Sequence, residues 1–509
     1  MNKFKNRMTL HPIMTFVILI AATIVFSGFL SLLGMQATYN RVSTSGELVS
    51  NLVSVQSLLS LSGLKYIFTT TVANFVSFAP LSMLLIVLIG IGVMEKSGFL
   101  KTAFTLLTKY CKKNTITFVL VLIGVSSSIV GDLGYIVLIP LSALLFKYGR
   151  RNPLIGITAA FASLSCGSGL SILLTAIDSA LRTTTLNSAS LIDSNYNIGV
   201  MAFFLIMAVA LILTSIIITI VTEKIVAEKL GKYDFKDEEE EFEIGKKETK
   251  GLIFGLGAGL IYIIFFIYNI IPGLPLSGSL LDYSQNFYID KLFSVNSFFS
   301  NGFVFIIMML FVILGLFYGI GAKTIKNNKD FAEDLGHSLD EIGKIIVLIL
   351  FASVFINIFK RTEIGTVITA LFANSISALN FSGIPLIILV FIISAITTLF
   401  LPSPIAKWAI ISGTAIPVLM TSNISPEFAQ TIFRFGESMT MGLTPVLAYF
   451  VIYLAYMDKY NDNEKPIALF QSLRYQLPYA MCVGALLLAL LIVWYLIGLP
   501  IGVGGVAII

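Results

Sequence analysis

The stretch LFLPSPIAKWAII, Leu399–Ile411, places two prolines, a serine, a lysine and a tryptophan inside an otherwise apolar run. Proline has no backbone N–H to donate, so it ends or kinks a helix. Broken backbone at membrane depth is tolerated only where protein buries it or where it lines a water-filled cavity. The stretch therefore predicts a turn between two apolar helices, with Lys407 and Trp408 directly after it.

The composition of the whole chain places this turn in a membrane protein. Hydrophobic residues make up 57% of the 509 residues and charged residues only 12%, with a mean hydropathy of +0.93. Soluble domains carry about 25% charged residues. The chain is long enough for about ten membrane passes of about 20 residues each. The basic residues behind the net charge of +5 lie in short loops between apolar runs, which indicates membrane topology and not nucleic-acid binding.

Nine apolar segments are predicted to span the bilayer as helices. The first has no small-residue cleavage site and is expected to remain as a signal anchor. Cytoplasmic loops hold an excess of Lys and Arg, which places the basic segment 2–7, and with it the N-terminus, on the cytoplasmic side of the cell inner (plasma) membrane. The predicted spans are residues 12–34, 79–97, 153–177, 199–222, 251–272, 302–321, 342–359, 427–456 and 476–497.

Two further apolar stretches, residues 115–147 and 383–421, do not fit as single spans, because each begins and ends on the same side of the membrane. The first is interrupted by SSSIVGDLGY, which includes Asp132, and the second by the turn quoted above. Each is predicted to be a re-entrant hairpin. The alternative is a full-length helical pair that turns at the far surface.

The same order of parts occurs in two halves, residues 1–232 and 251–509, which a charged cytoplasmic linker at 233–250 joins. In each half a hairpin precedes a helix interrupted by small and polar residues. Because the hairpins open to opposite sides, the halves are predicted to be an inverted repeat. Inverted repeats with broken helices are typical of secondary transporters, whose binding site lies where the breaks meet. The predicted fold is an all-α polytopic membrane protein with about nine transmembrane helices plus two re-entrant hairpins.

Other classes of function lack their sequence signals. The histidines His11 and His337 form no HExxH motif, and Cys111, Cys166 and Cys482 are too far apart to suggest a metal site. We expect no enzyme activity, metal or cofactor, and the chain has no GxxxxGK[ST] phosphate loop for ATP. A passive channel remains the alternative to a transporter.

Several strings spread over nearly the whole chain resemble the AbgT family, the p-aminobenzoyl-glutamate transporters of the ion-transporter superfamily. The resemblance implies nine spans and two hairpins per subunit, a homodimer, and transport of p-aminobenzoyl-glutamate or related aromatic carboxylate or sulfonamide-like compounds. It also implies coupling to protons, with sodium as the alternative, and some members of the family act as efflux pumps. A dicarboxylate or another small organic anion is the alternative substrate. The strings are NFVSFAPL, GIGVMEKSG, GDLGYIVLIPLSAL, GRRNPLIGITAAFA, AKWAI, SPEFAQTIFRFGESMT and WYLIGLPIG.

The resemblance also implies substrate- or ion-binding positions. The family's inner-helix aspartate corresponds to Asp178, its helix-start proline to Pro426 and its arginine to Arg434. Its hairpin asparagine corresponds to Thr398, and Ser171 stands where family members usually have asparagine. Both replacements keep a hydrogen-bonding side chain but remove the amide. Of the properties that the resemblance implies, they affect the identity of the substrate most.

Each candidate has a structural alternative. Asp178 is expected near the end of helix 153–177, where it could also be a solvated interfacial carboxylate, and Asp132 could cap the half-helix that follows it instead of contacting substrate. Lys407 could reach the outer surface or neutralise a carboxylate. Trp408, the family's hairpin tryptophan, could stack on an aromatic ring or belong to the interfacial aromatic belt. The Arg434 guanidinium suits a substrate carboxylate or Asp178, with an ion pair to Glu437 as the alternative.

Overall fold

The computed structural model of the chain describes residues 10–42, 47–172, 175–235, 244–294, 296–340, 342–462 and 465–509. The predicted basic segment 2–7 and residues 236–243 of the linker lie outside the described residues. Its helices and strands are α1 Pro12–Leu32, β1 Gln36–Val42, β2 Leu48–Ser54, α2 Leu61–Val76, α3 Ala79–Lys96, α4 Phe99–Tyr110, α5 Lys113–Ser126, α6 Leu133–Tyr148, α7 Pro153–Gly167, α8 Ala176–Ala189, α9 Phe204–Val221, α10 Ala227–Leu230, α11 Lys246–Ile270, α12 Tyr288–Phe293, α13 Phe298–Ala322, α14 Asn328–Gly336, α15 Gly343–Arg361, α16 Ile364–Ala378, α17 Gly383–Thr398, α18 Pro404–Thr421, α19 Pro426–Thr440, α20 Phe450–Lys459 and α21 Leu469–Ile497.

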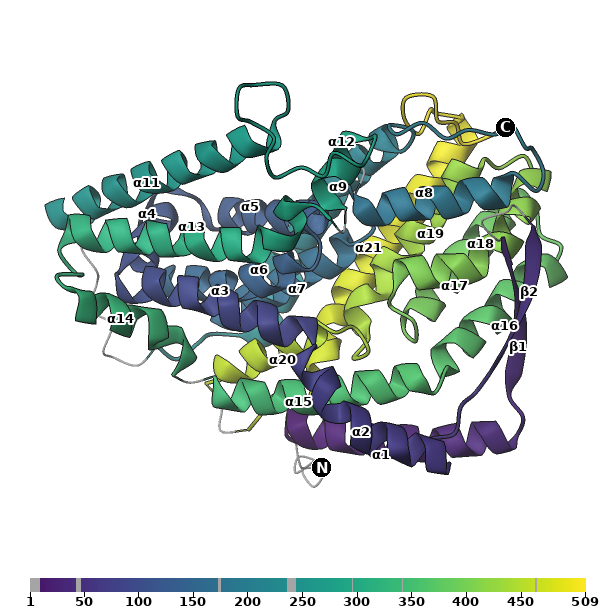
Figure 1. Cartoon of the computed structure of the whole chain (residues 1–509), viewed down its shortest axis with the longest axis horizontal. Helices are drawn as coiled ribbons and strands as arrows, with labels where there is room; N and C mark the ends of the chain where they lie inside the picture. Colours follow the sequence, from purple (N-terminus) through teal and green to yellow (C-terminus); the bar gives the residue numbers. More distant parts are fainter. Residues whose placement is uncertain are drawn as a thin grey trace.

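The helices form two groups along the long axis of the molecule (Figure 1). Helices α3, α4, α11, α13 and α14 lie toward one end, and α8, α16, α17, α18 and α19 lie toward the other. The long helix α21 runs between them and contacts α7, α9 and α19. In the second group α17 packs on α19, and α18 packs on α8 and α16. Helix α19 also contacts α7, α8 and α18, and it is buried along almost its whole length.

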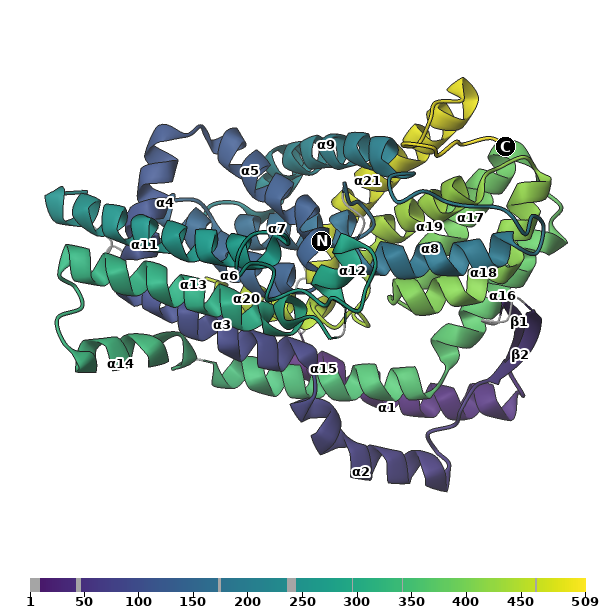
Figure 2. The same cartoon turned by 45° about the horizontal axis from the view of Figure 1, so that its top comes forward.

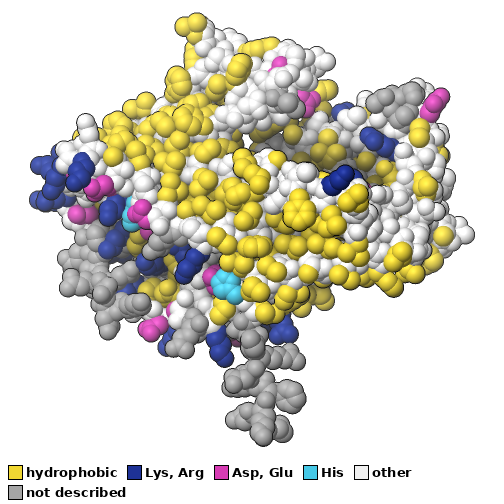
Figure 3. All heavy atoms as spheres, turned by 60° about the horizontal axis from the view of Figure 1, so that its bottom comes forward, with side chains coloured by type: hydrophobic (Ala, Val, Ile, Leu, Met, Phe, Trp, Pro, Cys, Tyr) yellow, Lys and Arg dark blue, Asp and Glu magenta, His cyan; other side chains and the backbone are white. Residues whose placement is uncertain are grey.

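Nine helical segments of the described chain are long and apolar enough to cross a membrane. Seven of them overlap predicted spans, but Leu61–Lys96 and Leu469–Ile497 begin earlier than the predicted residues 79 and 476. The other two are Lys113–Val130 and Pro404–Thr421, which belong to the predicted hairpins. Figure 3 shows hydrophobic side chains across the middle of one face and Lys and Arg side chains gathered toward one end. The surface therefore has the apolar belt of a multi-pass membrane protein.

The two predicted spans that are absent from this set each consist of two helices. Residues 153–177 contain α7, which ends at Gly167, and the start of α8, which begins at Ala176. Residues 427–456 contain α19 and part of α20, joined by a short 3₁₀ turn, Met441–Leu443, and an irregular segment. These interruptions leave helix ends, with their unpaired backbone groups, inside the protein.

Both predicted hairpins are helix pairs with a short turn. The first consists of α5 and α6, which a 3₁₀ turn, Ser127–Val130, joins, and the second of α17 and α18, with Pro404 at the start of α18. Lys113–Val130 and Pro404–Thr421 have 18 residues each, about 27 Å of helix, which is close to the thickness of a bilayer core. Whether the pairs turn back inside the membrane stays a prediction.

The structure adds one β-hairpin that the sequence analysis did not predict (Figure 2). Strands β1 and β2 pair in antiparallel fashion, with Thr38 opposite Leu52, and β1 lies against α16 and α18. The Asn374 amide of α16 donates to the carbonyl of Thr38 at 2.8 Å. The strands are short and partly polar, so they were indistinguishable from an external loop by hydropathy.

Gly413 of α18 allows this hairpin to approach closely. A Cβ atom at Gly413 would stand 2.2 Å from the carbonyl oxygen of Asn40, a backbone atom that cannot move independently. We expect Gly413→Ala to destabilise the protein by about 1–3 kcal/mol, the usual cost of overpacking. The measurement is the apparent melting temperature of the purified protein in detergent.

Gly257→Ala in α11 is the matched control, because a Cβ there would meet nothing within 4 Å. Alanine is the better helix former, so this change should be neutral or slightly stabilising. Equal melting temperatures for the two variants would contradict the assigned contact.

Candidate functional site

Helix α19 is polar in sequence but buried in the structure. It begins with Ser425, whose hydroxyl accepts from the backbone N–H of Phe428 at 3.1 Å, and with Pro426 in its first turn. Four long polar side chains follow at spacings of three or four residues, and each is no more than 3% exposed. Polar groups in such surroundings need partners inside the protein. The four residues are Glu427, Gln430, Arg434 and Glu437.

Two basic and two acidic side chains form one buried charge chain. The Arg434 Nη1 lies 3.0 Å from Glu437 Oε1, and its Nε lies 3.2 Å from Asp178 Oδ1. The Lys407 ammonium lies 3.3 Å from the other Glu437 oxygen. Lys407 and Glu437 are fully buried. With two positive and two negative groups, the cluster is neutral overall, which is the arrangement in which buried charges cost least.

The break between α7 and α8 holds the end of this chain that Arg434 and Asp178 form. The Arg434 Nη2 donates to the carbonyl oxygen of Ser168 at 2.5 Å, where α7 has just ended. The Thr175 hydroxyl donates to Asp178 Oδ2 at 2.6 Å and accepts from the Asp178 backbone N–H at 3.1 Å. A cation thus sits at a helix C-terminus and an anion at a helix N-terminus, as the two helix dipoles favour.

The turn between α17 and α18 supplies the other end. The Lys407 ammonium donates to the hydroxyl of Thr398, the last residue of α17, and lies 5.0 Å from the centre of the Phe433 ring. The Thr398 hydroxyl in turn donates to the carbonyl of Ser394 at 2.6 Å. Thr398, which stands in place of the family's asparagine, is thus one of the partners of the buried lysine.

A second polar chain leads from Trp408 to Gln430. The Trp408 indole N–H donates to the Thr185 hydroxyl at 2.9 Å, and that hydroxyl lies 2.7 Å from the Gln430 carbonyl oxygen. The Trp408 ring is fully buried and packs at a tilt on Phe433, with 4.5 Å between the centroids. Trp408 is therefore not part of an aromatic belt at the membrane surface.

A small cavity of about 20 Å³ lies beside the charge cluster, with Ser171, Asp178 and Gln430 among its lining residues. That is room for about one water molecule. Substrate-sized pockets are far larger, about 300–1,000 Å³. Binding of a substrate in this cavity would therefore require the surrounding elements to move apart.

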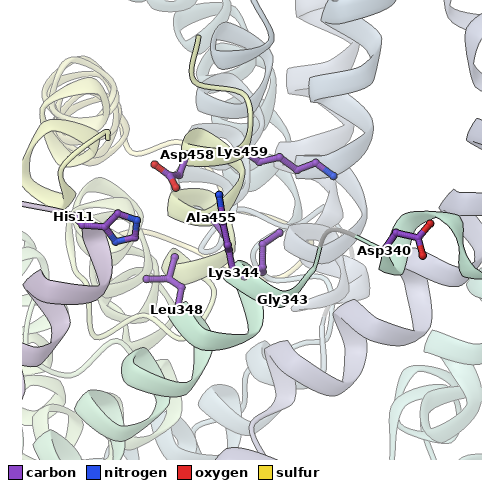
Figure 4. Close-up of a pocket in the computed structure, with 9 residues that line it drawn as sticks. His11, Asp340, Gly343, Lys344, Leu348, Ala455, Asp458 and Lys459 are labelled. Carbon is purple, nitrogen blue, oxygen red and sulfur yellow. The ribbon is translucent and has the colours of Figure 1, made fainter. Parts of the chain in front are cut away.

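A larger cavity of about 520 Å³ lies elsewhere, between the start of α1, the start of α15 and the end of α20 (Figure 4). Its lining includes His11, Asp340, Lys344 and Lys459, which are exposed side chains. It contains no member of the buried charge cluster. Burial, ion pairing and the position at the break between α7 and α8 favour the smaller cavity as the functional site.

The structure decides between several of the alternatives raised by the sequence. Asp178 lies in the first turn of α8, not at the end of helix 153–177, and with 8% exposure it is not a solvated carboxylate. Lys407 neutralises Glu437 and does not reach the surface. Arg434 contacts both of its expected carboxylate partners.

Two of the expected positions lie apart from the charge chain. Asp132 is exposed at the turn before α6 and interacts with Tyr449, in the segment between α19 and α20. Its side chain makes no capping hydrogen bond to α6. Pro426 starts α19 and contributes geometry, not a polar contact. Asp132 thus faces the second helix break while the cluster occupies the first.

The sequence analysis did not include Glu437, Gln430 or Thr185 among the site residues. Glu437 was considered only as the structural partner of Arg434, and it is the residue that joins Arg434 to Lys407. The spacing of polar residues along 427–437 could have identified Glu437 and Gln430. Thr185 carried no signal, because its role depends on the packing of α8 against α18 and α19. Among the described residues no group of three or more His, Cys, Asp or Glu side chains could hold a metal ion.

Comparisons with known proteins agree in the class of protein that they identify. The model of the AbgT putative transporter family matches residues 2–508. The p-aminobenzoyl-glutamate transport protein of Escherichia coli (strain K12) is 26% identical over 494 residues, which cover 97% of this chain and 94% of that protein. Two solved structures are also similar to this chain.

One of them is the YdaH transporter of Alcanivorax borkumensis, which is described as having an unusual topology. It is 26% identical to this chain and has a TM-score of 0.48, and the match covers 97% of this chain and 100% of the other. The other is MtrF of Neisseria gonorrhoeae, from a class of antimetabolite efflux pumps. It is 31% identical and also has a TM-score of 0.48, with 98% of each chain covered.

The charge cluster predicts non-additive effects of mutation. Lys407→Met leaves one surplus negative charge and Glu437→Gln one surplus positive charge, and each should cost about 3–5 kcal/mol, as when one partner of a buried pair is lost. The double variant keeps the neutral Arg434–Asp178 pair. It should therefore be less destabilised than the sum of the single changes, as measured by thermal unfolding in detergent.

The exposed pair Lys329 and Glu333, 3.8 Å apart on α14, is the control. Lys329→Met, Glu333→Gln and their combination should change stability by less than about 1 kcal/mol and additively. Additive losses at Lys407 and Glu437 would show that these charges are not energetically coupled.

Proposed function

This chain belongs to the AbgT family of putative transporters, and from that membership we propose that it carries p-aminobenzoyl-glutamate or a related aromatic carboxylate or sulfonamide-like compound, driven by an ion gradient. The name of the Escherichia coli relative supports this substrate class. The nine apolar spans of the described chain support transport across a membrane. A dicarboxylate or another small organic anion is the alternative, because it would offer Arg434 the same carboxylate.

The observation that carries the proposal is the setting of Arg434. Its side chain is 1% exposed and its guanidinium is shared between two carboxylates, one from α8 and one from its own helix. Guanidinium groups bind carboxylates in a planar, two-pronged geometry. The contact with Asp178 is an ion pair in which the Nε–H is not aligned for a hydrogen bond. A substrate carboxylate can therefore replace Asp178 at this edge of Arg434.

The charge balance of the cluster can couple substrate binding to the uptake of a proton. The cluster is neutral with Asp178 ionised, so a substrate carboxylate at Arg434 would bring a surplus negative charge into a buried site. An unpaired buried charge is neutralised by a proton more readily than it is tolerated. We therefore propose that Asp178 takes up a proton when the substrate displaces it. Sodium is the alternative coupling ion.

The cellular setting follows from the same proposal. We propose that the protein lies in the cell inner membrane with its N-terminus in the cytoplasm, which the distribution of basic loops in the sequence supports. It is proposed to work as a homodimer without cofactor and without catalysis. Both import and export are compatible with the mechanism, because exchange at Arg434 is reversible.

Transport by the purified protein in liposomes tests the function. We expect uptake of p-aminobenzoyl-glutamate against its gradient when a pH gradient is imposed, inhibited by a sulfonamide and little affected by succinate. Flux that only dissipates a substrate gradient would indicate a channel. Uptake driven by a sodium gradient and not by a pH gradient would identify sodium as the coupling ion. Flux of succinate alone would favour the alternative substrate.

Asp178→Asn tests the coupling. The amide cannot be ionised, so this variant should still exchange p-aminobenzoyl-glutamate between the two sides but should lose accumulation driven by a pH gradient. Asp193→Asn is the control, because Asp193 is an exposed carboxylate in the segment after α8. Accumulation by Asp178→Asn at the level of the unchanged protein would show that another group carries the proton.

A further inference from the structure

A third cavity, of about 240 Å³, lies between α4, α5 and α6, and no member of the buried charge cluster lines it. Its wall is almost wholly hydrocarbon. The hydroxyl of Ser142, one of the few polar groups in the wall, donates to the carbonyl of Ile139 on its own helix at 2.8 Å. A carboxylate would find no partner in such a wall, so the cavity does not suit a small organic anion. The apolar lining includes Phe104, Leu107, Val119, Ile123, Leu138 and Leu141.

The cavity opens on a face that the bilayer covers. Three of its lining residues are well exposed, Leu107 at 40%, Val119 at 45% and Ile123 at 51%. Helix α5 begins the segment Lys113–Val130, which is long and apolar enough to cross a membrane, and the turn between α4 and α5 lies at the outline of the molecule (Figure 2). Water does not fill an apolar cavity, and an empty one loses dispersion contacts. Hydrocarbon from the bilayer is therefore the occupant that this cavity favours.

The length of the cavity wall matches one leaflet of a bilayer. Thr115, in the first turn of α5, and Ile123, further along the same helix, both line the cavity. The helix between them rises about 12 Å, at about 1.5 Å for each residue. One leaflet supplies half of the hydrocarbon core, about 15 Å. The wall therefore suits a single acyl chain that enters at the end where α5 begins.

That end of the cavity is strongly basic. Lys109, Lys112 and Lys113 are exposed, and within the described residues none of them forms an ion pair with an acidic side chain. Each lies within two residues of Cys111, which lines the cavity, so its Cα atom is at most about 8 Å from that of Cys111. Helices α4, α5 and α6 contain no acidic residue. Basic loops are common beside membrane spans, but a basic cluster at the mouth of a cavity between such helices is suited to anionic lipid head groups.

We propose that this cavity binds an anionic phospholipid of the surrounding bilayer, with one acyl chain between α4, α5 and α6 and the phosphate at Lys112 and Lys113. The site is separate from the buried charge cluster and does not depend on the proposed function. A zwitterionic phospholipid can fill the apolar wall equally well, but its head group also carries a positive charge, which the lysines repel. The charge of the head group therefore decides which lipid binds.

Native mass spectrometry of the full-length protein in detergent tests the site. The protein receives equal amounts of phosphatidylglycerol and phosphatidylcholine with the same acyl chains, and the measurement is the ratio of the two lipids in the first lipid adduct. For the unchanged protein we expect a preference for phosphatidylglycerol of about 30-fold, from about fivefold for each of two lysines. The double change Lys112→Gln and Lys113→Gln should bring the ratio close to one.

Val119→Trp tests the cavity separately from the charge. The larger side chain fills the opening while every lysine stays in place, and the exposure of Val119 leaves room for the ring. Because the acyl chain is excluded, the preference for phosphatidylglycerol should again fall close to one. If this variant keeps the preference of the unchanged protein, the lysines attract lipid without the cavity and the proposed site is wrong.

The double change Lys326→Gln and Lys329→Gln is the matched control. It removes the same charge from exposed positions just before and within α14, a helix that packs on α3. This variant should keep the ratio of the unchanged protein. A fall as large as that of the Lys112 and Lys113 variant would indicate a general effect of net charge. A ratio of one for the unchanged protein would mean that any lipid, or a second copy of the chain, covers this face. Either result would overturn the proposal.

Discussion

The structure depends on one constraint: two cations and two carboxylates are buried together and must neutralise each other. Lys407, Glu437, Arg434 and Asp178 come from three helices, α18, α19 and α8, and Glu437 joins Lys407 to Arg434, which also pairs with Asp178. Such clusters contribute little net stability, because desolvation offsets the attraction. Ionisable groups at membrane depth are usually functional, which favours this cluster as the candidate site.

The helix interruptions make this cluster possible. Arg434 satisfies a carbonyl at the end of α7, and Asp178 begins α8 beside Thr175. A continuous helix through residues 153–177 would have paired these backbone groups internally and left the charges without partners. The interruptions also leave the cluster able to rearrange, because the contacts between Arg434 and Asp178 join two elements and not two turns of one helix. In the proposed mechanism a substrate replaces one of these charges.

The sequence predicted the membrane class, most spans and the turn at Pro402–Pro404, because hydropathy and proline act locally. It also pointed to Asp178, Lys407, Trp408 and Arg434, since charged and aromatic residues are conspicuous in apolar surroundings. It did not identify Gln430 or Thr185 as site residues, whose roles arise only when α8 packs on α18 and α19. It also omitted the β1–β2 hairpin, in which Gly413 accommodates Asn40 through a contact between distant segments. Local patterns therefore predicted the elements, whereas the partners of buried polar groups required the tertiary structure.

The central claim is that the substrate carboxylate takes the place of Asp178 at Arg434 and that a proton restores neutrality. The most direct measurement is the heat of binding of p-aminobenzoyl-glutamate to the purified protein in two buffers with different ionisation enthalpies at the same pH. The account predicts uptake of about one proton for each substrate bound, since one buried carboxylate loses its partner. Binding with no proton uptake would contradict it.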